Sequence, residues 1–277
     1  MKKRFTDKHP VLGLLLFTYG AFIISEFLVG IILMFALSSV IKDSETATAI
    51  GGCIGAVLVL VLWYARYSKE YHFMPRKGEL SGALRLIMPP MLVYWLFLFG
   101  AYAVLAKAFP FAAPTMKIFF LALLAGLVEE VCFREVAVSF MARTMMSEKR
   151  IPWIAAVSGL LFGLTHLTNI FSGKPLFDVA YQVLLCIFTG VFFAAIYLRK
   201  GNVWILCLFH FLHDFLAFMG VNGLAAVGVT DFPDWMAVYI AVLEGVLCLY
   251  GFYLLRKAKR KEIIRLWDYK WSRDSAD

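Results

Sequence analysis

The sequence predicts an all-α membrane protein, a bundle of eight transmembrane helices that forms one integral-membrane domain over residues 1–277. Two observations support this: 62% of the residues are hydrophobic and the mean hydropathy is +0.79. A membrane-spanning helix needs about 20 mainly apolar residues, and the chain contains eight such stretches. The predicted spans are 11–40, 47–65, 86–107, 117–142, 152–168, 178–198, 202–220 and 235–255.

Local signals support these spans in order along the chain. The first stretch is long enough to tilt, and its length argues against a cleaved signal peptide. Pro89 and Pro90 lie near the start of the third span and should kink or delay that helix. Pro152 suits the first turn of the fifth span. The loops on the outer side contain Pro, Gly and Asp, as turns do, and are expected at 108–116, 169–177 and 220–234.

The net charge of +8 follows from topology and does not indicate nucleic-acid binding. With the amino terminus in the cytoplasm and alternating sides, 22 of the 27 Lys and Arg residues fall in cytoplasmic segments. Only Lys42, Lys107, Lys117 and Lys174 fall outside. The positive-inside rule therefore predicts a multi-pass protein of the cell membrane with both termini in the cytoplasm.

The five cysteines all lie in apolar stretches and form no CxxC pair. We interpret them as small buried hydrophobic residues. Cys132 lies beside two glutamates, whereas a reactive thiolate needs an electropositive and accessible setting. A nucleophilic role for Cys132 is therefore the less favoured alternative.

Three of the apolar stretches carry ionisable side chains. An ionisable group inside a membrane span costs about 2.5–3.5 kcal/mol on insertion scales, and nothing in such a span needs these groups for stability. They therefore indicate a functional site. The residues are Glu129, Glu130 and Arg134 in the fourth span, His166 in the fifth, and His210, His213 and Asp214 in the seventh.

Helical spacing divides these groups into pairs. Glu130 and Arg134 are four residues apart and can form an ion pair. Glu129 points about 100° away from Glu130, which leaves its carboxylate for chemistry. His210 and Asp214 share a helix face by the same spacing, so Asp214 can orient His210 and favour its imidazolium form.

The helix rise places Glu129, His166 and His210 in one broad band within the membrane. A carboxylate and an imidazole at one level suit the activation of a water molecule in a dry cavity. Glu129 and His166 could polarise that water. His210 with Asp214 could meet the negative charge that develops on an attacked carbonyl oxygen.

Other interpretations stay open at this stage. Membrane histidines often only pack or form hydrogen bonds, and Glu26 and Glu244 on the first and last spans have the same alternatives, packing or lining a cavity. Chains of carboxylates and histidines also make the proton relays of transporters. We expect no cofactor, because no His-Glu-x-x-His motif or other zinc spacing occurs. A metal bound by His166, His210 and Glu129 is conceivable.

The three motifs together resemble those of the CPBP family, the CAAX-protease and bacteriocin-processing (Abi) intramembrane peptidases. The family pattern is Glu-Glu-x-x-x-Arg, Phe-x-x-x-His and His-x-x-x-Asn/Asp on successive helices. Here it reads Glu129-Glu130…Arg134, Phe162…His166 and His210…Asp214. The resemblance covers residues 117–220, which we predict to be the catalytic core.

The resemblance implies an endopeptidase that cleaves a membrane-associated peptide or membrane protein. Glu129 and His166 would activate water, and His210 and Asp214 would form the oxyanion side. Glu130, Arg134, Phe162 and His213 would support them. Some members of the family are non-catalytic membrane regulators or immunity proteins, which is the main alternative.

Two departures from the family pattern stand out. Glu135 follows the motif arginine where many relatives have Gly, and Asp214 replaces the Asn of the eukaryotic-type enzymes.

Overall fold

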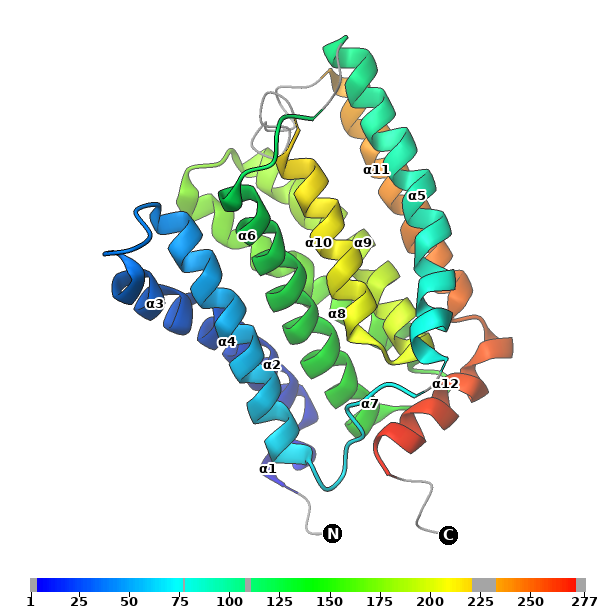
Figure 1. Cartoon of the computed structure of the whole chain (residues 1–277). Helices are drawn as coiled ribbons and strands as arrows, with labels where there is room; N and C mark the ends of the chain where they lie inside the picture. Colours follow the sequence, from blue (N-terminus) through cyan, green and yellow to red (C-terminus); the bar gives the residue numbers. More distant parts are fainter. Residues whose placement is uncertain (1–3, 77, 108–110, 221–232, 273–277) are drawn as a thin grey trace.

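The computed structural model describes residues 4–76, 78–107, 111–220 and 233–272. Within these ranges every regular element is a helix, and the one β-type contact is an isolated bridge between Phe111 and Gly220. The helices run side by side as a bundle (Figure 1). The chain is therefore an all-α membrane protein, as the hydropathy predicted.

The helices of the amino-terminal half are α1 (Phe5–Lys8), α2 (Pro10–Phe22), η1 (Ile23–Val29), α3 (Gly30–Leu37), α4 (Ser44–Tyr67), α5 (Glu79–Ala106), α6 (Met116–Leu124), η2 (Ala125–Glu129) and η3 (Val131–Val138). Those of the second half are α7 (Ser139–Met145), α8 (Ile151–Thr165), η4 (His166–Ser172), α9 (Leu176–Lys200), α10 (Val203–Phe218), α11 (Asp234–Leu254) and α12 (Lys257–Lys270).

Six of these helical stretches in the described part of the chain are long and apolar enough to cross a membrane. They correspond to the predicted spans one, two, three, five, six and eight. The remaining two predicted spans are also helical. The stretch 116–145 carries the charged motif residues, and Val203–Phe218 has only 16 residues. The total of eight spans thus stays a prediction.

Side-chain caps begin several of the helices. Asp43 Oδ2 accepts a hydrogen bond from the Thr46 amide at 2.8 Å at the start of α4, and Asn202 Oδ1 accepts from the Ile205 amide at 3.1 Å at the start of α10. These caps satisfy amides that have no partner within the helix. Gly201 ends α9 in the left-handed region with φ of 61°, where glycine is the residue of least strain.

Two long helices change their winding in mid-membrane. The stretch 10–37 is π-helical at Ile23–Val29, and the stretch 116–145 is π-helical at Ala125–Glu129 and again at Val131–Val138. Such turns leave backbone groups out of the regular ladder and occur frequently at functional sites. In the stretch 116–145, Glu129 ends the first π-helical segment and Glu130 lies between the two. The local winding of this helix therefore directs both carboxylates.

Close approach of helices depends on glycine at two places. A Cβ built on Gly126 would lie 2.6 Å from the Phe211 amide nitrogen of α10, and one built on Gly190 would lie 2.7 Å from the Cα of Gly159 in α8. Small residues let membrane helices approach closely enough to pack by van der Waals contact. These contacts bring η2 against α10 and α8 against α9. Of these helices η2, α8 and α10 carry motif residues.

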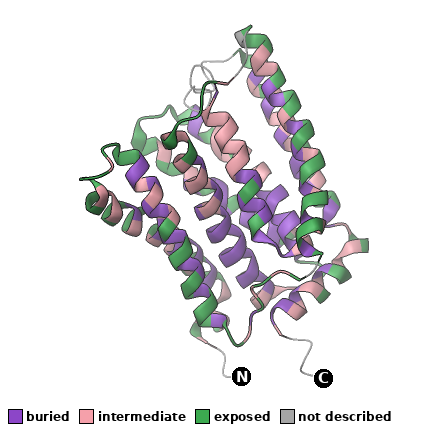
Figure 2. Ribbon diagram, viewed as in Figure 1, coloured by how far each residue is buried: buried purple, intermediate pink, exposed green. Residues whose placement is uncertain are grey.

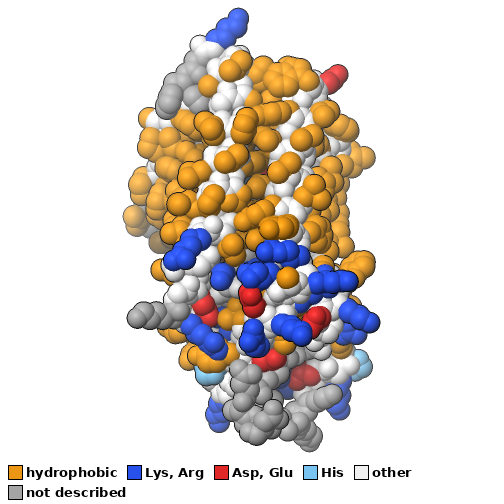
Figure 3. All heavy atoms as spheres, turned by 90° about the vertical axis from the view of Figure 1, so that its right-hand side faces the viewer, with side chains coloured by type: hydrophobic (Ala, Val, Ile, Leu, Met, Phe, Trp, Pro, Cys, Tyr) orange, Lys and Arg blue, Asp and Glu red, His pale blue; other side chains and the backbone are white. Residues whose placement is uncertain are grey.

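Charged side chains gather at one end of the molecule, which we call the basic end. It holds α1 and α12 (Figure 1), and Lys and Arg side chains form a band there next to a large apolar surface (Figure 3). Ion pairs join distant segments at this end. Arg143 Nη1 lies 2.7 Å from Asp7 Oδ1, and Arg143 Nη2 lies 3.0 Å from Glu70 Oε2.

The helix α12 packs against the bundle at the basic end, which the sequence did not reveal. Trp267 Nε1 donates to the Leu198 carbonyl at 3.0 Å, and Trp271 Nε1 donates to the Ser139 carbonyl at 3.0 Å. Ile263, Trp267 and Lys270 are buried. The charged run 256–261 therefore begins an amphipathic helix whose apolar face is buried against the bundle.

Candidate active site

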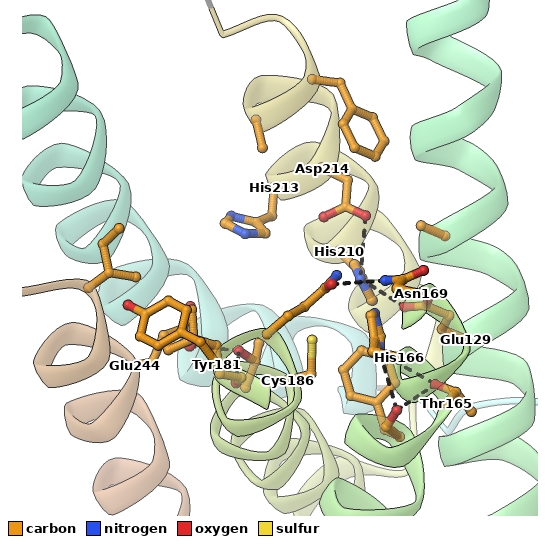
Figure 4. Close-up of a pocket in the computed structure, with 18 of the residues that line it drawn as sticks. Glu129, Thr165, His166, Asn169, Tyr181, Cys186, His210, His213, Asp214 and Glu244 are labelled. Carbon is orange, nitrogen blue, oxygen red and sulfur yellow. Dashed lines mark hydrogen bonds and ion pairs between the residues drawn. The ribbon is translucent and has the colours of Figure 1, made fainter. Parts of the chain in front are cut away.

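One large cavity of about 870 Å³ lies between the helices, and the predicted site residues converge on it. Burial increases towards the centre of the bundle (Figure 2), and the close-up shows the labelled motif side chains around one space (Figure 4). Six of the predicted residues line the cavity: Glu129, Phe162, His166, His210, His213 and Asp214. Glu130 and Arg134 lie behind this wall, with both side chains fully buried.

His210 lies at the centre of the motif residues. Its Nδ1 is 2.7 Å from Glu130 Oε1, and its Nε2 is 3.3 Å from Glu129 Oε2 and 3.7 Å from Asp214 Oδ2. An ionised carboxylate can only accept hydrogen bonds. The imidazolium, which carries an N–H on each ring nitrogen, therefore fits both contacts.

The spacing argument identified only part of this arrangement. Glu130 and Arg134 do pair, with Nη1 of Arg134 3.1 Å from Oε1 of Glu130. Asp214 is close to His210, but it is the most distant of its three carboxylate neighbours. The nearest, Glu130, comes from another helix, so no spacing along the chain could indicate it.

Aromatic rings complete the surroundings of Arg134. Its guanidinium carbon lies 4.8 Å from the centre of the Phe162 ring and 5.6 Å from that of Phe193. A cation over a ring face is favoured most where water is excluded. The second motif thereby stabilises the arginine of the first.

Phe162 also contacts the other two motifs. Its ring lies edge-on to His166 at 5.2 Å between centroids and edge-on to His210 at 6.0 Å. Phe193 stacks on His210 at 5.7 Å. Phe162 therefore contacts both imidazoles, and Phe193 contacts that of His210.

His166 lies at the junction of α8 and η4, where the helix tightens. Its Nδ1 is 3.4 Å from the Phe162 carbonyl and 3.4 Å from Thr165 Oγ1. His213 takes a different position, with its Nδ1 accepting a hydrogen bond from Trp95 Nε1 at 3.2 Å. This hydrogen bond joins α5 to α10 at the edge of the cavity.

Three further carboxylates line the cavity outside the motifs: Glu26, Asp178 and Glu244. Glu244 accepts hydrogen bonds from Tyr94 Oη at 2.5 Å and from Thr189 Oγ1 at 2.6 Å. Glu26, from the π-helical part of the first long helix, lines the same space as Glu129. Of the alternatives left open for Glu26 and Glu244, lining a cavity is the one seen. Charge in an apolar stretch had indicated Glu26 and Glu244 in the sequence but could not decide between these alternatives.

Both ring nitrogens of His210 face carboxylate oxygens, Nδ1 that of Glu130 and Nε2 that of Glu129. In the described residues no group of three or more His, Cys, Asp or Glu side chains is placed to hold a metal. Cys132 is fully buried and is not among the cavity-lining residues.

Fold and cavity together define an integral multi-pass membrane protein whose ionisable motif residues border one cavity between the helices. Residues 111–216 match the family model described as type II CAAX prenyl endopeptidase Rce1-like. The chain therefore carries an Rce1-like domain of the CAAX protease family, a family of peptidases, and the motif resemblance is confirmed. The matched segment contains all three motifs and overlaps the predicted core at 117–220. A comparison with curated proteins gives no match.

Proposed function

We propose that the protein is an intramembrane endopeptidase that hydrolyses a peptide bond of a membrane-associated peptide or protein in the cell membrane. The observation that carries the proposal is the contact of His210 Nε2 with Glu129 Oε2 at 3.3 Å in a cavity that His166 also lines. A carboxylate, an imidazolium and a second imidazole are the groups that water attack on a carbonyl needs. The Rce1-like match supports a peptidase.

Each group has one role in the proposed reaction. Glu129 takes a proton from a water held with His166, and the oxygen of that water attacks the carbonyl carbon. Once Glu129 holds the proton, its contact with His210 Nε2 weakens, and the Nε2–H donates a hydrogen bond to the carbonyl oxygen as it becomes negative. The proton then passes to the departing amine, which leaves a new carboxylate and a new amino group.

Glu130, Arg134 and Phe162 position this machinery. Glu130 holds the charged form of His210 at 2.7 Å, and Arg134 balances the charge of Glu130. Asp214 lies near the same imidazole and helps to stabilise its charged form. The family resemblance suggests that the biological role is peptide processing or self-immunity towards a bacteriocin.

The test replaces Glu129 with its neutral isostere in purified protein. Glu129→Gln should abolish cleavage of a membrane-peptide library, and His166→Ala should do the same, each at near-normal membrane abundance. Glu135→Gln is the matched control, because Glu135 is a buried carboxylate on the same helix and is not among the cavity-lining residues. Cleavage in detergent, with no ion gradient, would separate a peptidase from a proton-coupled transporter.

A Glu129→Gln protein that keeps its cellular effect would identify the chain as a non-catalytic regulator. Retained cleavage would show that the water is activated elsewhere.

A further inference from the structure

The cavity lies on the side of the bundle away from the basic end. On α10 it begins at His210 and reaches Phe218, the last residue of that helix. Between η4 and α9 it reaches the exposed residues 172–175, and on α5 it reaches Tyr102 near the helix end. Of the Lys and Arg residues that the structure describes, only Lys174 lines the cavity.

The distances along the helices agree. At about 1.5 Å per residue, His210 lies roughly 12 Å from Phe218, the end of α10 that the cavity reaches. His166 is the first residue after α8 and lies roughly 22 Å from Ile151, the end of that helix on the basic side. Glu129 and His166 are thus nearer the end that carries few basic residues, and His210 lies close to the middle of α10.

The half of the bundle next to the basic end is closed by buried side chains. Tyr197 Oη donates to Glu135 Oε2 at 2.5 Å, and Tyr71 Oη lies 3.3 Å from Tyr197 Oη. Lys270 of α12 is 1% exposed beside them. The neighbouring side chains on η3, α7 and α9 are at most 1% exposed, among them Val136, Val138, Phe140, Phe192 and Ile196.

The charge of the two ends gives the direction across the membrane. The band of Lys and Arg at the basic end matches the cytoplasmic side by the positive-inside rule. At the opposite end Lys117 is balanced by acidic groups, with its Nζ 2.9 Å from Glu45 Oε2. The mouth of the cavity therefore faces the non-cytoplasmic side.

We infer that the substrate is a peptide segment on the non-cytoplasmic side of the membrane, either an exported peptide or the outer end of a membrane-inserted one. That the bound peptide is a substrate rests on the proposed peptidase function. The direction of access rests on the cavity and the charge band alone. Hydrolysis needs only water, which the same mouth admits.

The chain contains its own probe of access. Cys186 lines the cavity and is partly exposed, whereas Cys53, Cys132, Cys207 and Cys248 do not line it in the described structure. A charged, membrane-impermeant methanethiosulfonate reagent is applied to right-side-out and to inverted vesicles that hold the full-length protein. Modification of Cys186 should be at least tenfold faster in right-side-out vesicles, and Cys186→Ala should abolish this signal.

Two matched variants fix the orientation. Lys174→Cys and Arg150→Cys each replace an exposed basic residue, one at the mouth and one at the basic end. Lys174→Cys should be modified only from the outside and Arg150→Cys only from the cytoplasmic side. Modification of Cys186 from the cytoplasmic side alone would overturn the inference. The inference would also be overturned if Cys186 were modified from neither side in vesicles in which Lys174→Cys is modified.

The outcome is independent of catalysis. Glu129→Gln protein should show the same sidedness as the wild type. If peptides added outside are not cleaved although Cys186 is reached from outside, the peptidase proposal fails and the direction of access stands. Cleavage only of peptides enclosed on the cytoplasmic side would refute the access inference and leave the peptidase proposal intact.

Discussion

The helical stretch 116–145 carries two buried polar clusters that differ in what surrounds them. The motif cluster consists of Glu129, Glu130, Arg134, His210 and Asp214 and borders the cavity. The tyrosine cluster consists of Tyr71, Glu135, Tyr197 and Lys270 and is sealed by α12. Both place a carboxylate among apolar helices, yet only the first has space beside it for a substrate. Burial of charge therefore indicates importance, and the adjacent cavity separates a reactive role from a structural one.

The largest difference between the clusters should appear on removal of the central carboxylate of the first. Glu130→Ala leaves both Arg134 and His210 without their nearest counter-charge and should cost about 3–5 kcal/mol, together with all activity. Glu135→Ala removes the acceptor of the Tyr197 hydroxyl and the carboxylate that attracts Lys270. Because Lys270 has a lowered pKa and can lose its charge, this change should cost only about 1–3 kcal/mol. Thermal unfolding in detergent compares them, and equal losses would contradict the distinction.

The next largest effect concerns the rate alone. His210→Ala removes the proposed oxyanion donor, so kcat should fall by about 10²–10³. Tyr197→Phe, in the tyrosine cluster, should leave the rate per folded molecule unchanged. Initial rates normalised to folded protein measure both, and a similar decrease in the two variants would show that the sealed cluster takes part in catalysis.

A smaller effect is expected at Asp214. Its carboxylate is 3.7 Å from His210 Nε2, farther than either glutamate. A contribution of about 0.5–1.5 kcal/mol corresponds to a two- to tenfold lower rate in Asp214→Asn. Rate measurements beside His210→Ala decide this. A loss as large as that of His210→Ala would mean that Asp214 itself meets the substrate.

The smallest effect concerns the pH dependence of α12 docking. Burial lowers the pKa of Lys270, and attraction by Glu135 opposes that shift only in part. Between this lowered pKa and the unfolded value near 10.4, the unfolded chain holds a proton that the folded chain has lost, so stability rises with pH. At lower pH the cost of burying the charge is fully present.

Lys270→Met removes this charge and keeps an apolar chain of similar length. The Tm advantage of Lys270→Met over wild type should be greatest near neutral pH and shrink as the pH approaches 10. A constant difference across this range would show that the ammonium of Lys270 remains solvated.

Sequence reasoning succeeded where contacts are local and failed where they depend on helix packing. The Glu130–Arg134 pair follows from a spacing of four residues within one helix. The contact of His210 with Glu130 needs the close approach at Gly126, and no periodicity encodes it. Docking of α12 was hidden by its basic composition, although Ile263, Trp267 and Trp271 recur every four residues, the signal of a buried stripe.

Phe162 and Phe193 both line the cavity, while Arg134 directly behind them has no exposed surface. The two rings act as a dielectric partition. On one side a fixed positive charge stays unhydrated and keeps its full effect on Glu130, since low dielectric strengthens a charge interaction. On the other side lies the cavity, which reaches the exposed residues 172–175. The rings thus separate a dry charge from the space proposed for the reaction, while Arg134 still acts on His210 through Glu130.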